Sequence, residues 1–237
     1  MKKKNLTFIK TFPAILAACI FLICIIPIRQ PCAARLILRP LEKKLRNKIE
    51  FKSSLVKVSR GISLWGVSAI DAAGRGYYCA SADVRYGLPE FILKREFSFA
   101  LKDIKFYGNI GLMDSVTEIL SIDRLPDVEF NEVSGTVRLL EEGVSIKNAS
   151  ASGDSVRIEG GGRVGKDGML DCDIHFSFSP DITDKVPEVI KAALLEPEDG
   201  NRMGISFKAY GNYKNPSLHL RSDGLKLNIM RGIFDDE

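Results

Sequence analysis

The chain has few of the residues that build enzymatic or metal sites. Only two of its 237 residues are histidine, and its five cysteines form no C-x-x-C pair. A structural zinc site therefore has no support. Nucleophilic catalysis needs a base close to a serine or cysteine, and neither His175 nor His219 lies near a nucleophile motif. We expect no catalytic residues, no metal and no cofactor.

The chain also lacks a broad excess of charge of one sign. Its net charge is +4, and much of the positive charge lies near the N-terminus. From Glu50 onward acidic and basic residues nearly balance, so we expect no nucleic-acid partner. A composition that is 45% hydrophobic and 27% charged predicts one ordinary globular domain after the first thirty or so residues.

One long apolar run stands near the N-terminus. Residues 1–10 are basic, and the 18 residues of 11–28 carry no charge. At about 1.5 Å per residue a helix of that length just spans a hydrocarbon core of roughly 30 Å. The pattern favours a retained single-pass anchor behind a cytoplasmic tail over 1–10. A cleaved signal peptide is the alternative, since a basic start and an apolar middle fit it too.

The orientation of this anchor stays open from the sequence. More basic residues follow the run than precede it, which by the positive-inside rule places the domain in the cytoplasm. Large domains, however, translocate regardless of flanking charge. Residues 34–49 predict an amphipathic juxtamembrane helix, with Leu38, Leu41, Leu45 and Ile49 on one side. Such a helix either lies on lipid headgroups or caps the end of a sheet.

After Glu50 apolar residues alternate with polar ones, and glycine turns separate the segments. This texture predicts a mainly β domain over 50–228, an antiparallel meander, followed by an acidic tail over 229–237. Residues 113–120 fit a helix or a strand. Residues 184–195 are the one later helix that we expect, with Pro187 in its first turn.

Alternation gives the sheet one apolar and one polar face, and an apolar face must be covered. One helix of about a dozen residues is too small to cover eight or more strands, so the cover is the sheet itself or a lipid. We therefore predict a lipid-facing groove. Its candidate residues are Leu139, Val144, Ile146, Val156, Ile158, Leu170, Ile174, Phe176, Phe178 and Phe207.

Three further patterns favour ordinary sheet structure. Residues 160–165 match G-x-G-x-x-G, but a further strand follows instead of the helix that a nucleotide site needs. Asp171, Asp173 and His175 share one strand face at a spacing open to a cation, yet they alternate with apolar residues and so indicate a solvated face. Cys79 and Cys172 lie in separate predicted strands, and we expect free thiols.

Five segments carry a resemblance to a known family. They are, in order, VSGTV at 133–137, GVSIKNA at 143–149, VRIEGGGRV at 156–164, LDCDI at 170–174 and YGNYKNPSL at 210–218. In this order they resemble the C-terminal region of the AsmA-like proteins, which include AsmA and TamB. The match covers roughly residues 130–222. Each motif alone is a pattern that many β-sheets share, whereas the five motifs in this order are more specific to the family.

The resemblance implies a bacterial inner-membrane anchor, a periplasmic domain and a curved sheet that holds membrane lipid. About ten strands at ~4.8 Å each give a groove on the order of 50 Å, too short to bridge two membranes. We expect a protein of envelope biogenesis that binds or passes lipid. The alternative is a non-catalytic assembly subunit, on a plan similar to type II secretion N-like proteins, that pairs with an envelope protein through its sheet edge.

Overall fold

The computed structural model describes residues 28–29, 31–45, 49–57, 59–70, 76–87, 93–107, 111–122, 128–212, 216–221 and 228–229. The predicted cytoplasmic tail and, apart from Ile28, the predicted anchor over 11–28 lie outside these residues. So does the acidic tail beyond Ile229. Within the described part of the chain, no helix combines the length and apolar character that a bilayer span requires.

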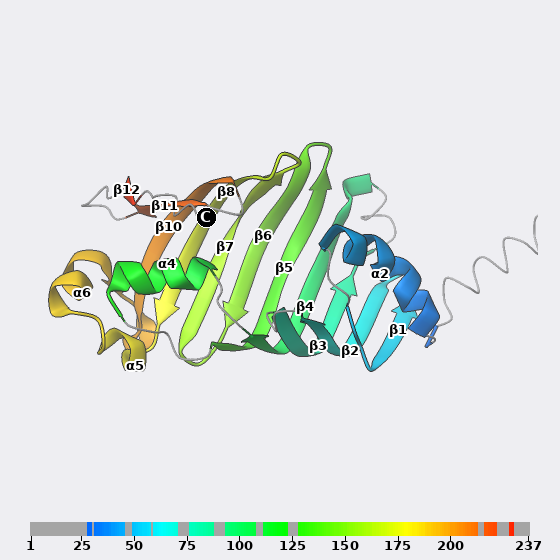
Figure 1. Ribbon diagram of the computed structural model, residues 1–237, viewed down its shortest axis with the longest axis horizontal. Coiled ribbons are helices and arrows are strands. Elements are labelled where there is room, and N and C mark those ends of the chain that lie inside the picture. Colours follow the sequence, from blue (N-terminus) through cyan, green and yellow to red (C-terminus); the bar gives the residue numbers. More distant parts are fainter. Residues whose placement is uncertain are drawn as a thin grey trace, which may run out of the picture.

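The described chain forms one 12-stranded antiparallel sheet whose strands lie almost entirely in chain order (Figure 1). The open path runs from β1 to β8, then through β10 and β11 to β12, and β9 pairs with β10. The strands are β1 Ser53–Lys57, β2 Gly61–Ile70, β3 Gly76–Arg85, β4 Glu96–Tyr107, β5 Glu129–Leu140, β6 Gly143–Ser152, β7 Val156–Gly165, β8 Met169–Phe178, β9 Glu196–Pro197, β10 Met203–Asn212, β11 Ser217–Arg221 and β12 Asn228–Ile229. The predicted antiparallel meander is confirmed.

The prediction of a single later helix was wrong. Helix α4, Gly111–Leu120, lies between β4 and β5, and Met113, Val116 and Leu120 are buried at helical spacing. The apolar residues of this segment fit the period of a helix and the period of a strand equally well, so the local pattern did not distinguish the two structures. Of the helix expected over 184–195, only α6, Glu188–Leu194, forms; the short helix α5, Pro180–Thr183, precedes this range and the 3-10 turn η1, Asp199–Asn201, follows it. Pro187 caps α6.

Helix α2, Pro31–Leu45, takes the place of the predicted juxtamembrane helix but ends earlier. Ala34 and Leu38 are buried in the core, whereas Leu36 between them is 67% exposed. The Arg35 guanidinium lies 5.4 Å from the centre of the Phe51 ring, a cation–π contact. This helix therefore covers the β1 end of the sheet, and contact with lipid headgroups stays a prediction.

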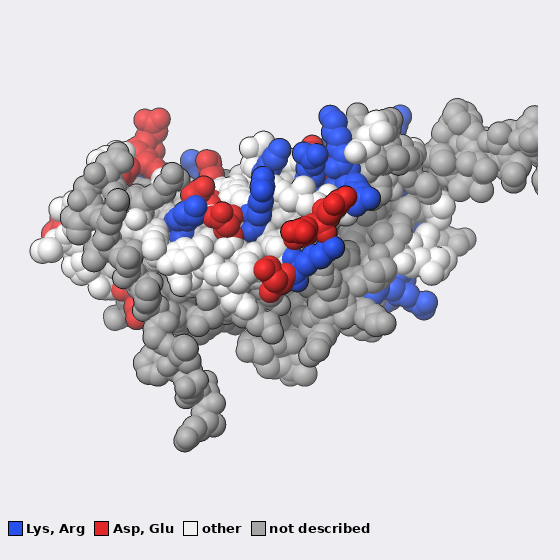
Figure 2. Space-filling model, turned by 90° about the horizontal axis from the view of Figure 1, so that it is seen from above, with Lys and Arg blue, Asp and Glu red and all other residues white. Residues whose placement is uncertain are grey.

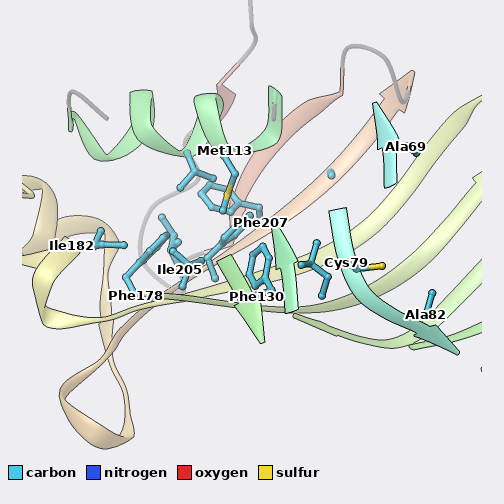
Figure 3. Packing of buried hydrophobic residues seen from close by; sticks show 14 of the residues in the cluster. Ala69, Cys79, Ala82, Met113, Phe130, Phe178, Ile182, Ile205 and Phe207 are labelled. Atoms are coloured by element: carbon cyan, nitrogen blue, oxygen red, sulfur yellow. The ribbon is translucent and has the colours of Figure 1, made fainter. Parts of the chain in front are cut away.

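The densest part of the core lies beneath α4. Phe176 and Phe178 of β8 and Phe207 of β10 are all essentially inaccessible to solvent. The Phe176 ring contacts both others, at centroid distances of 6.1 and 5.9 Å. Figure 3 shows Met113 of α4 pointing down toward Phe207 and Ile205, and Ile182 of α5 closing the side. Because α4 sits on this end of the sheet, these aromatics are ordinary core.

A crease crosses β2 to β4, and it changes which residues face inward. Gly66 and Asp103 adopt left-handed backbone, with φ of 60° and 52°. On β2, Leu64 and Val67 are both buried although they are three residues apart. Glycine reaches this conformation without strain. Alternation is therefore out of phase on the two sides of the crease.

Cys79 and Cys172 form no disulfide with each other, as expected; Cys79 is buried, Cys172 is partly buried, and Cys32 is exposed. Burial raises the pKa of the Cys79 thiol, and the thiolate is the form that alkylates. We expect a maleimide to modify Cys32 rapidly in the native protein and Cys79 only after denaturation. Peptide mapping by mass spectrometry measures both. Modification of the two at equal rates would contradict the packing around β3.

Candidate functional site

The register of β5 to β8 decides which side chains share the apolar face. Leu139 pairs with Val144, Val144 with Val164, and Val164 with Leu170. One row along, Phe97 pairs with Val137, Val137 with Ile146, and Ile146 with Gly162. Apolar residues therefore lie side by side on one face across four neighbouring strands.

The structure divides the predicted groove residues into three groups. Val156, Phe176, Phe178 and Phe207 are buried in the core, with at most 1% of each residue exposed. The reason is α4, whose apolar side covers them. Ile158, Leu170 and Ile174 are half-buried against the edge of that core, whereas Leu139, Val144 and Ile146 lie outside the core cluster. Only this last group, with the border residues, keeps the position that a lipid contact requires.

The uncovered part of the apolar face is a strip between the two helices. We define the apolar strip as Phe97, Val137, Leu139, Val144, Ile146 and Val164, all of them partly or largely exposed. Leu139 is the most open, at 39%. In Figure 1, α2 crosses the strands toward β1 and α4 those toward β10, and β5 and β6 are visible between them. The strip lies on these central strands and their neighbours.

The opposite face of the sheet carries charges of both signs. Figure 2, which is turned by 90° from Figure 1, shows basic and acidic side chains of the described residues interspersed on the surface seen from above. Lys208 pairs with Asp171 at 3.1 Å and Lys105 with Glu129 at 2.6 Å. Asp171 and Asp173 are exposed there, as the alternation predicted. In the described chain no group of three or more potential ligands is placed to hold a metal.

A hydrogen-bonded array lies on this polar face. Nδ1 of His175 is 2.8 Å from Oγ of Ser206, its cross-strand partner, and Nε2 is 2.5 Å from Oε1 of Glu198. Glu198 comes from the segment between β9 and β10 and lies over Gly204. The imidazole is therefore held on both sides and is only partly exposed.

This array has the residue types of a nucleophilic triad but not its surroundings. Ser206 lies in the middle of β10, with strands paired on both sides. The backbone N–H groups around it belong to the ladder, so they do not converge on a developing oxyanion. We interpret the array as a rigid polar wall.

A hollow of about 900 Å³ adjoins this wall. It is lined by the polar residues Ser145, Lys147, Asn148, Glu159, Arg163, Asp173, His175, Glu196 and Ser206, by Gly160, Gly161 and Gly162, and by Ile146, Ile174 and Phe207. The glycine run that matches a nucleotide motif lies inside β7, and strand β8 follows it, as expected, where a nucleotide site would need a helix. Sequence reasoning missed this hollow because the register that brings β6, β7, β8 and β10 together is not a local property.

With the geometry in place, the chain can be compared with known proteins. No protein-family model, curated protein or solved structure matches it.

Proposed function

We propose that this chain is a non-catalytic, membrane-anchored protein of the AsmA-like kind that holds lipid acyl chains on the apolar strip. The observation that carries the proposal is the strip itself. The sheet has helices over both ends of its apolar face, whereas on the central strands Leu139 is exposed and the other side chains of the strip are only partly buried. An acyl chain supplies the missing cover.

The strip suits a chain-like ligand better than a compact one. Its side chains are aliphatic apart from Phe97, and they stand in adjoining cross-strand rows. Each buried CH₂ contributes about 0.8 kcal/mol, so affinity comes from area and needs no fixed polar anchor. The cost of fixing the ligand reduces the net gain. Such a surface binds lipids by chain rather than by headgroup.

Two sequence features add support for the envelope setting. The apolar run over 11–28 has the length of a membrane anchor, and the ordered motifs over 130–222 resemble the AsmA-like region. On this proposal the anchor lies in a bacterial inner membrane, the sheet lies on the periplasmic side, and membrane lipid is the partner.

The alternative, an assembly subunit that pairs through its sheet edge, has less support. At the β1 edge, the amide of Ile28 donates to the Val56 carbonyl at 2.8 Å, and the Val56 amide donates to the Ile28 carbonyl at 2.9 Å. The chain thus occupies part of that edge itself, and an incoming strand would have to displace it.

Photo-crosslinking tests the lipid proposal. A benzophenone amino acid at Leu139, in the full chain expressed in bacterial membranes, is expected to form an adduct with phospholipid that mass spectrometry detects. The same probe at Arg138 is the matched control, because this neighbouring residue is exposed and alternation places it on the polar face. Equal adduct at both positions, or none at Leu139, would refute acyl-chain binding on the strip.

A further inference from the structure

We infer that the polar hollow binds a zwitterion that carries a phosphate and an ammonium group. This site lies on the face opposite the apolar strip and is independent of the lipid chains proposed there. Lys147 and Arg163 would hold the phosphate, and Glu159 and Glu196 the ammonium.

A glycine, which has no side chain, lies at the centre of the hollow. Gly161 of β7 belongs to the polar face, where alternation places Glu159 and Arg163 on either side of it along the strand. Across the ladder it pairs with Asp173 of β8. On the other side β6 has a register shift between Ile146 and Ala149. Charged side chains therefore surround an open patch of backbone.

The β6 bulge brings a basic side chain to this patch. Asn148 adopts a left-handed conformation, with φ of 50°, and the extra residue lets Lys147 and Asn148 both line the hollow. Bulges commonly redirect side chains in this way. Lys147 and Arg163 then lie toward the β6 side, whereas Asp173, His175 and Glu196 lie toward β8 and β10. The hollow has a basic half and an acidic half.

Four of the charged side chains around the hollow have no partner in the part of the chain that the structure describes. Among the described residues, the side chains of Lys147, Glu159, Arg163 and Glu196 make no ion pair or hydrogen bond. Elsewhere on the same face cross-strand pairs do form, such as Lys208 with Asp171 at 3.1 Å. A ligand with both charges complements these four groups at once.

The chemistry of the lining groups favours phosphate as the anionic part. A planar guanidinium binds phosphate through two parallel hydrogen bonds, and a lysine adds a second positive charge. Carboxylates suit a primary ammonium, and the array of His175, Ser206 and Glu198 gives the acidic half a fixed wall. Phosphoethanolamine has these two groups at short separation, either free or as the headgroup of a phospholipid.

Titration calorimetry of the full chain in an uncharged detergent, with phosphoethanolamine as the probe, tests the inference. We expect saturable binding that weakens with added salt, since charge pairing supplies the affinity. Arg163→Gln and Glu159→Gln should each weaken binding about tenfold, the effect of about 1.4 kcal/mol. Arg157→Gln should leave it unchanged, because this arginine lies on the same strand and face but outside the hollow.

Competition distinguishes the two sources of the ligand. Displacement by short-chain phosphatidylethanolamine, but not by short-chain phosphatidylglycerol, would identify a lipid headgroup. Binding that only free phosphoethanolamine competes for would identify a soluble metabolite. Absence of saturable binding, or an equal loss in the Arg157 variant, would overturn the site. Neither result bears on the crosslink at Leu139, so the two proposals can fail separately.

Discussion

Replacement of Phe176 by alanine is expected to remove a large fraction of the free energy of unfolding of this protein. The side chain is fully buried, its ring contacts those of Phe178 and Phe207, and α4 closes the cluster from above. Truncation of a buried phenylalanine costs about 3–5 kcal/mol. The whole stability of a domain is only about 5–15 kcal/mol. Thermal denaturation followed by circular dichroism, with limited proteolysis, measures the loss.

Leu139→Ala is the matched control for this experiment. It removes a comparable apolar group from the same sheet, but Leu139 is 39% exposed and lies outside the core cluster. The expected cost is below about 1 kcal/mol, because little buried area is lost. If both variants lost the same stability, the division between packed core and open strip would be wrong.

Replacement of Arg202 by methionine is expected to cost about 2–4 kcal/mol, because its partners lose a buried, charged donor. Its guanidinium donates from Nε to Ser177 Oγ at 3.0 Å and from Nη2 to the Ser177 carbonyl at 2.9 Å. It also reaches the carbonyls of Asp154 and Ser155, at 3.0 and 3.3 Å. Arg202 thus joins the turn before β7 to the end of β8.

Urea denaturation gives the size of this effect through the shift in midpoint. Burial lowers the pKa of Arg202, and the nearby Arg157 lowers it further. Arginine nevertheless stays charged at any pH the fold experiences. Arg157→Met is therefore the control: it removes an exposed, like-charged neighbour and should leave stability unchanged or slightly higher. A loss in this variant that matched the loss in Arg202→Met would contradict the role assigned to the buried hydrogen bonds.

The central strands could be predicted well from the sequence, because the polarity of each residue indicates which face of the sheet it lies on. From Val133 to Phe178 apolar and polar residues alternate with few interruptions, and β5 to β8 follow that pattern. On β2 to β4 the crease at Gly66 and Asp103 shifts the phase. Inward residues there are three apart, as at Leu64 and Val67, and strict alternation cannot describe them.

The helices that pack on the apolar face were harder to predict than the strands of the sheet. Whether residues 113–120 form a strand or a helix depends on the apolar surface that Phe207 and Phe178 present, which is a tertiary effect. The error had a functional consequence, since four of the predicted groove residues lie in the buried core to which α4 and α5 contribute. The polar array was missed for a similar reason. Ser206 and Glu198 reach His175 only through the pairing of β8 with β10.

Because successive strands are also spatial neighbours, the sheet can lengthen by simple insertion. Each hairpin pairs almost entirely with the strands that come directly before and after it in the chain. Duplication of a hairpin such as β6–β7 would add about 10 Å to the sheet, at about 4.8 Å per strand, without rerouting the remaining chain. The length of the sheet can therefore change in evolution without a change in the helix-covered strands at its two ends.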